Sequence, residues 1–220
     1  MTIFQIIAIC ALVICKITLL FHFIRIVKLG APKDLSQKSG SVSKGVIYAN
    51  TTSMLPQHKE SAYMHLPTYS AGILFHIGTF SALFIFVLSL FPFFNPLLQF
   101  LNRWLQCEMI VQYIIAGFMA ITTFCGIMLF IKRIMSKSLK VLSNADDYIS
   151  NGLTTLFQLM TVLFLVFPAQ DKIVAVYYII IALLLLYLPF GKLKHALYYF
   201  AARYHLGFFY GWRNVWPPKK

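Results

Sequence analysis

Charged residues are scarce in this sequence, and acidic residues are scarcer still. Lys, Arg, Asp and Glu make up 11% of the 220 residues, with 19 Lys and Arg against 6 Asp and Glu, while apolar residues make up 60%. A soluble domain needs a largely polar surface, so this composition predicts a protein whose solvent is lipid. The basic residues lie in short segments between apolar stretches, which indicates membrane topology and not nucleic-acid binding.

Cysteine pairs and catalytic motifs are also missing. The chain has no C-x-x-C pair, which argues against an iron–sulfur site and against a disulfide framework. It has no phosphate-binding glycine loop, no Ser/His/Asp constellation and no paired carboxylates placed for a pocket. These absences leave no independent catalytic constellation in the chain. The four cysteines fit packing positions in or beside apolar stretches: Cys10, Cys15, Cys107 and Cys125.

Five apolar stretches are long enough to cross a hydrocarbon core, which takes ~20 helical residues. They lie near 2–24, 69–93, 108–131, 151–168 and 173–191. The first is too long for a signal peptide and lacks a small-residue cleavage site, so it is a span. The fourth is short and is expected to extend back through the polar stretch 144–150. The sequence therefore predicts an all-α fold, a single membrane domain over 1–220 built as an integral membrane bundle of five transmembrane helices.

The distribution of basic residues predicts how this bundle is oriented. The loop 25–68 holds six Lys/Arg, the segment 132–150 holds four and the tail 192–220 holds six, whereas the opposite side holds only Arg103 and Lys172. Because basic loops stay in the cytoplasm, we expect the N-terminus outside and the C-terminus in the cytoplasm, in the inner (cytoplasmic) membrane of a cell. The loop is too polar and too short to fold alone.

An ionisable side chain inside a membrane span is energetically costly, so a histidine such as His76 at that place points to a function. His76 lies about seven residues into the second span, roughly 10 Å below the cytoplasmic surface, and His195 lies at the cytoplasmic end of the fifth. One histidine from each of two spans in the same half of the membrane is the arrangement needed for bis-histidine ligation of a haem b. Gly72 and Gly78 flank His76 and would leave room for a flat macrocycle. The alternative is that His76 hydrogen-bonds across helices and His195 is an interfacial polar residue.

The sequence around both histidines resembles a known family. Leu74-Phe75-His76-Ile77-Gly78 in the second span and Pro189-Phe190-Gly191-Lys192-Leu193-Lys194-His195 at the end of the fifth are similar to the gamma subunit of respiratory nitrate reductase. The same superfamily includes the cytochrome b subunit of heterodisulfide reductase and the membrane cytochrome of the sulfite-reductase-associated complex. Asn144-Ala145-Asp146-Asp147 is similar to that family's sequence before its fourth helix. The resemblance covers about 69–204.

The resemblance implies a haem b that carries electrons between a membrane quinone and a cytoplasmic iron–sulfur subunit of the same complex. It also implies that His76 and His195 are the axial ligands of the haem nearer the cytoplasm. In the nitrate reductase gamma subunit a second haem lies nearer the outside, and its ligand positions here hold Phe86 and Tyr177, which are not plausible ligands in this role. We therefore expect one haem, and a quinone that binds in the cytoplasmic half of the membrane.

Further candidate site residues lie near the cytoplasmic side. Candidates for the haem propionates are Lys192, Lys194 and Arg203, and candidates for the quinone or proton site are His65, Lys192, Asp146 and Asp147. For the two aspartates, capping of the fourth helix is an open alternative. The aromatic and basic tail is expected to lie on the membrane surface or against the soluble partner, and a plain interfacial anchor is its alternative.

Two other classes of function compete with the haem subunit. One is a haem-free membrane anchor or assembly subunit of such a complex, which would keep the bundle without the electron-transfer chemistry. The other is a small transporter, but the sequence has no inverted repeat or paired broken helices to support it. The missing second ligand pair makes the haem-free subunit conceivable, whereas the presence of both His76 and His195 argues against it.

Overall fold

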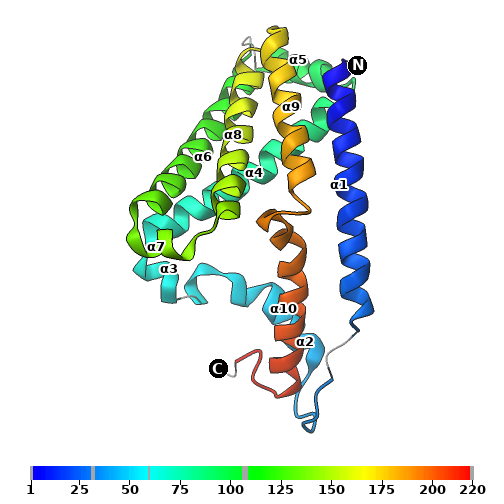
Figure 1. The fold of residues 1–220 in the computed structure, drawn as a ribbon, viewed down its shortest axis with the longest axis vertical. Helices are drawn as coiled ribbons and strands as arrows, with labels where there is room; N and C mark the ends of the chain where they lie inside the picture. The colour runs from blue at the N-terminus through cyan, green and yellow to red at the C-terminus, as the bar shows by residue number, and fades with distance from the viewer. Residues whose placement is uncertain (1, 31–32, 59, 106–108, 219–220) are drawn as a thin grey trace. The chain divides into compact units, whose positions relative to one another are not determined.

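Residues 2–30, 33–58, 60–105 and 109–218 are described by the computed structural model of this chain. All secondary structure in these residues is helical and none is strand, which confirms the predicted all-α fold (Figure 1). The chain divides into two compact units, whereas the sequence predicts a single domain. Unit 1 is Met1–Cys15 with Pro67–Lys192, and unit 2 is Lys16–Leu66 with Leu193–Lys220.

Four helices in the described ranges are long and apolar enough to cross a membrane, and a fifth crossing depends on a broken helix pair. The four are α1 (Ile3–Lys28), α4 (Leu66–Ser89), α6 (Ile110–Met135) and α8 (Ala145–Val166). The predicted fifth span is α9 (Asp171–Tyr187), which is followed by the turn η3 (Lys192–Lys194) and by α10 (His195–Trp212). The chain is therefore a multi-pass membrane protein. As predicted, the fourth span extends back through the polar stretch, because α8 begins directly after Asn144.

The helices of unit 1 pack through small and polar side chains. Membrane helices commonly do so, because lipid is as apolar as their surfaces and burying apolar side chains between helices gives no hydrophobic gain. A Cβ built onto Gly126 in α6 would lie 2.6 Å from ring atoms of Phe75 in α4 and 2.6 Å from the Thr155 hydroxyl in α8. The fully buried amide of Gln158 in α8 donates to the Phe75 carbonyl at 3.0 Å and to the Thr79 hydroxyl at 2.8 Å. These contacts hold α4, α6 and α8 together.

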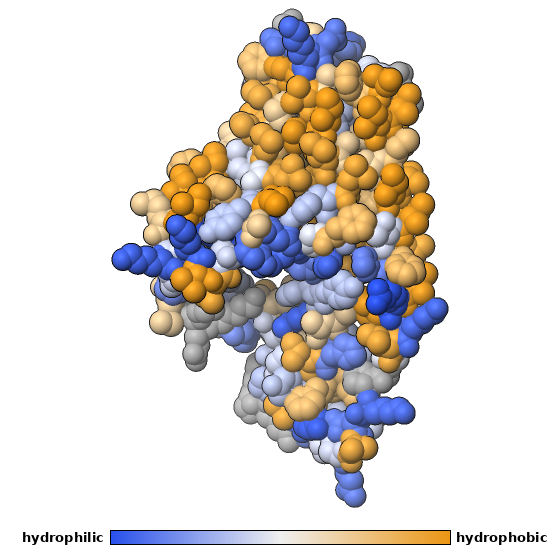
Figure 2. Space-filling model, in the orientation of Figure 1, coloured by the Kyte–Doolittle hydropathy of each residue, from blue (hydrophilic) through white to orange (hydrophobic). Residues whose placement is uncertain are grey.

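The outward surface of unit 1 is apolar. Figure 2 shows hydrophobic residues over much of the visible surface of α9 and of the N-terminal part of α1. Large apolar side chains are exposed there, among them Ile3, Ile7, Val176 and Leu183. Exposed apolar residues on long apolar helices are what a lipid-facing surface requires.

A short amphipathic helix, α5 (Phe94–Trp104), connects α4 to α6 and was not predicted from the sequence. It buries Phe94 and Leu98 against the bundle. The buried Asn102 side chain donates to the Gln112 side chain at 2.6 Å and accepts from the Val111 backbone N–H at 3.0 Å. This amide pair fixes the start of α6.

Unit 2 is formed by the C-terminal half of α1, the long polar loop and the C-terminal tail. The loop contains α2 (Val42–Asn50), η1 (Thr52–Met54), η2 (Pro56–His58) and α3 (Glu60–Met64). The backbones of α2 and α10 touch, because a Cβ on Gly45 would collide with the Gly207 carbonyl and one on Gly211 would lie 2.7 Å from the Ser41 carbonyl. The tail thus supplies a packing partner for the loop.

An ion pair joins the start of the loop to the end of α10. The Arg213 guanidinium donates to both carboxylate oxygens of Asp34, one of them at 3.0 Å. The Ser36 backbone N–H also donates to Asp34, at 2.9 Å. The Ser36 N–H and hydroxyl, followed by Arg213, hold the pKa of Asp34 below its usual value. The indole N–H of Trp212 donates to the Ser36 carbonyl at 2.9 Å, which links the same two segments a second time.

Gly45→Ala is expected to loosen unit 2. Alanine favours a helix by about 1 kcal/mol over glycine, but here its methyl group would collide with backbone of α10, and overpacking costs about 1–3 kcal/mol. Limited trypsin digestion should therefore cleave faster at Lys38 and Lys44. Gly117→Ala in α6 is the matched control, because a Cβ there meets nothing within 4 Å. Equal cleavage rates for Gly45→Ala and the wild type would contradict the close packing.

Candidate functional site

His76 lies on an exposed face of α4 with its ring held by the helix itself. Its Nδ1 is 2.7 Å from the Gly72 carbonyl one turn earlier. Because a carbonyl only accepts, Nδ1 carries the proton in this contact. A hydrogen bond of this kind is what orients histidines that bind metals. A Cβ on Gly72 would meet nothing within 4 Å, so the space at this glycine is open.

The expectation for Gly78 is wrong. A Cβ on Gly78 would collide with the Thr122 side chain of α6, so this glycine serves helix packing and does not leave room for a macrocycle. The physical reason is the helical period. Gly72 lies one turn before His76 on the same face, whereas Gly78, two residues after it, lies on the opposite face.

His195 is the first residue of α10 and is exposed. It follows Lys194 in η3. His76 belongs to unit 1 and His195 belongs to unit 2. Their pairing therefore stays a prediction from the sequence.

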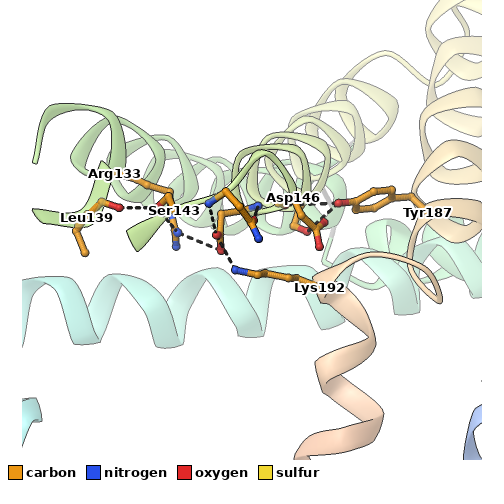
Figure 3. A network of polar contacts seen from close by, with 9 residues as sticks. Arg133, Leu139, Ser143, Asp146, Tyr187 and Lys192 are labelled. Atoms are coloured by element: carbon orange, nitrogen blue, oxygen red, sulfur yellow. Dashed lines mark hydrogen bonds and ion pairs between the residues drawn. The ribbon is translucent and has the colours of Figure 1, made fainter. Parts of the chain in front are cut away.

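A polar network that includes Arg133, Asp146 and Lys192 is drawn in Figure 3, and Asp147 belongs to it. Its carboxylate is 3.1 Å from the Arg133 guanidinium and 2.6 Å from the Lys192 ammonium. It also accepts from the Asn144 backbone N–H at 3.0 Å, while the Asn144 side chain accepts from the Asp147 N–H at 3.2 Å. This is a capping box for α8, the alternative left open for this residue. Lys192, a candidate for a propionate, has Asp147 as its partner instead.

Asp146 belongs to the same network. Its carboxylate accepts from the Ser150 hydroxyl at 3.2 Å, and its carbonyl accepts from the Tyr187 hydroxyl at 3.5 Å. The Ser150 and Tyr187 oxygens are themselves 3.4 Å apart. The network thus ties the start of α8 to the end of α9, a structural role for both aspartates.

Arg203, the third candidate for a propionate, has partners within unit 2. Its Nε donates to the Ala49 carbonyl at the end of α2 at 2.7 Å, and its Nη2 donates to that carbonyl and to the Ser53 hydroxyl. Its guanidinium carbon is also 6.0 Å from the Tyr199 ring centre. Arg203 therefore joins α10 to the end of α2. His65, a candidate for the quinone site, lies between α3 and α4 and is exposed.

The positions at which the family resemblance would place a second pair of ligands are filled by an aromatic cluster. Phe86 and Tyr177 are both fully buried in unit 1. The Tyr177 ring stacks on Phe164 with centres 4.4 Å apart, and lies 5.2 Å from the Tyr178 ring. Tyr178 in turn lies 6.4 Å from Phe86. The four rings thus form one continuous buried cluster that includes both positions.

Sequence reasoning missed an apolar groove in unit 2, between the C-terminal half of α1 and α10. The groove has a volume of about 720 Å³. Its polar side chains are those of Tyr204 and His205. The signal was available as apolar residues at helical spacing in the tail, but the many aromatic residues there suggested a membrane-surface anchor. On the same two helices, the Tyr198 hydroxyl is 3.3 Å from His22 Nδ1.

Comparisons of the chain with protein-family models, with characterised proteins and with solved structures find no match.

Proposed function

We propose that this protein is the haem b membrane subunit of a respiratory oxidoreductase complex, passing electrons between a membrane quinone and a cytoplasmic iron–sulfur subunit. The observation that carries the proposal is the state of His76, an imidazole on an apolar helix whose Nδ1–H is held by Gly72. In this proposal the N-terminus lies outside, the C-terminus lies in the cytoplasm, and the membrane is the inner (cytoplasmic) one.

The residues present fit a haem by the chemistry of their donors. A b-type haem takes imidazole nitrogens as axial ligands. His76 is exposed on α4 with its Nδ1–H bonded to the Gly72 carbonyl, and His195 is exposed at the start of α10. His76 and His195 would hold the iron, and Lys194 is the basic residue next to His195 that would meet a propionate. The haem, when bound, supplies a carrier for one electron at a time.

The aromatic cluster supports a single haem. Phe86 and Tyr177 are buried and packed against rings of their own unit, at the positions where the ligands of a second haem would lie. With one haem on the cytoplasmic side, quinol oxidation releases its two electrons and two protons on that same side. Turnover by itself then moves little charge across the membrane.

A haem-free membrane anchor or assembly subunit is the second candidate function. It is favoured by one specific observation, that Lys192, Asp147 and Arg203 all have partners within the protein. Residues proposed for haem and quinone contacts would then have purely structural roles. The anchor would keep the same helices and the same basic cytoplasmic side.

Reduction by a quinol separates the two candidates. The purified chain in lipid nanodiscs is mixed anaerobically with a short-tailed benzoquinol or naphthoquinol, and the haem absorption is followed. The electron carrier should be reduced by at least one of the quinols within the mixing experiment. A protein that contains haem but is reduced by dithionite alone, and by neither quinol, would contradict quinone-linked electron transfer. A protein without haem would be the anchor.

A further inference from the structure

The groove between α1 and α10 has the composition of a small-molecule site. Its volume of about 720 Å³ lies within the range of roughly 300–1,000 Å³ that is usual for ligand pockets. Its lining is apolar apart from two side chains, which is the usual make-up of such pockets. The described lining residues are Leu19, Phe23, Ile26, Val27, Gly30, Ala196, Leu197, Phe200, Ala201, Tyr204 and His205.

The polar residues gather at one end of the groove. Within unit 2 the C-terminal half of α1 and α10 run toward the same end (Figure 1), and the contact of Tyr198 with His22 sets their register. Tyr204 and His205 follow Tyr198 by two turns, which places them near the end of α1. The apolar wall from Leu19 to Val27 is about 12 Å long at ~1.5 Å per residue. The groove therefore offers a long apolar slot with hydrogen-bonding groups at one end.

The chemistry of the polar end distinguishes between membrane ligands. A phospholipid headgroup carries a phosphate, which calls for Lys or Arg. None of the described residues that line the groove is Lys, Arg, Asp or Glu. Tyr204 offers a neutral hydroxyl and His205 an imidazole, and both are donors for a carbonyl oxygen. Histidine can also give or take a proton near neutral pH. A ring with carbonyl oxygens and a branched apolar tail matches this arrangement, and a phosphate does not.

We infer that the groove binds a membrane quinone, with the ring at Tyr204 and His205 and the isoprenoid tail along the apolar wall of α1 and α10. The inference deepens the proposed function, on which it rests for the use made of the quinone. It replaces His65, Asp146 and Asp147 as the quinone site, because both aspartates have structural partners. His205 donates to one carbonyl and is the group through which a proton is exchanged.

Photolabelling of the full chain in phosphatidylcholine nanodiscs tests the site without reference to haem. The probes are azido derivatives of a short-tailed benzoquinone and a short-tailed naphthoquinone, with the parent quinones as competitors. Labels mapped by mass spectrometry are expected on the 19–30 and 196–205 segments. Added phosphatidylglycerol should not compete. Labelling elsewhere only, or labelling that phosphatidylglycerol displaces as well as the quinone does, would overturn the site.

A matched pair of variants sharpens the result. Ala201 lines the groove, whereas its neighbour Ala202 is exposed and is not among the lining residues. Ala201→Phe should fill the groove and reduce specific labelling about tenfold or more, while Ala202→Phe should leave it within about twofold. His205→Leu removes one donor and should weaken labelling roughly fivefold to tenfold. Equal labelling of Ala201→Phe and Ala202→Phe would contradict the inference.

Haem content measured on the same samples keeps the two proposals apart. Specific labelling of the groove in a protein without haem would leave the quinone site standing and remove the electron-carrier function. One haem per chain with the groove unlabelled would remove the quinone site and leave the haem-subunit proposal standing. Haem content should be unchanged in Ala201→Phe, because that residue has no part in holding the haem.

Discussion

His76→Ala is expected to abolish haem binding while the protein stays folded in the membrane. The variant removes the imidazole that is proposed as one axial ligand, and a haem with one axial ligand left should not survive purification. His76 is exposed on α4, so its loss should leave the packing of α4 against α6 and α8 intact. The haem-to-protein ratio, from a pyridine haemochrome assay, and the helical circular dichroism signal measure the two effects.

His58→Ala is the control for that experiment. His58 is also exposed, at the end of η2 in the long loop, and has no role in the proposed site. It should keep the wild-type haem content. Haem retained at the wild-type level in His76→Ala, with the fold unchanged, would contradict the assignment of this ligand.

Tyr177→Ala is expected to produce the largest loss of stability. The Tyr177 ring is fully buried, and it stacks on Phe164 with centres 4.4 Å apart. Replacing a buried aromatic side chain by alanine costs about 3–5 kcal/mol, because a cavity is left that the neighbours fill only in part. Unfolding in mixed micelles of increasing dodecyl sulfate content should therefore shift to a clearly lower detergent fraction.

Phe80→Ala gives the matched control for the aromatic cluster. Phe80 is 64% exposed on α4, so its truncation should change stability by less than about 0.5 kcal/mol. Equal destabilisation by Tyr177→Ala and Phe80→Ala would show that the cluster is not a packed core. The aromatic cluster would then no longer support the expectation of a single haem.

Four of the five spans were predictable, because a helix that crosses a membrane needs a long apolar run, and such runs are easily recognised in a sequence. The extension of α8 to Asn144 was predictable as well, since Asn followed three residues later by Asp is a capping pattern. The break after Tyr187 was not predicted as the start of a new helix. Pro189 and Gly191 read as the end of a span, and α10 mixes aromatic, basic and small residues without a clear apolar stripe.

The fold of unit 2 depends on contacts between distant segments, which a single sequence rarely shows. Gly207 and Gly211 form the small-xxx-small spacing that allows close helix contact, and this signal could have been used. The sequence does not show that their partner is Gly45 in the loop. The same limit applies to Asp147. Its capping role was an open alternative, but its ion pairs with Arg133 and Lys192 join three helices and follow only from the fold.

The stoichiometry of haem in the purified wild-type chain tests the central claim most directly. A dithionite-reduced minus oxidised absorption spectrum identifies the haem type, and haem and protein are quantified on the same sample. The proposal predicts one low-spin haem b per chain. Two haems per chain would contradict the expectation of a single haem drawn from Phe86 and Tyr177. A chain purified from haem-supplemented cells without any haem would contradict the electron-carrier function itself.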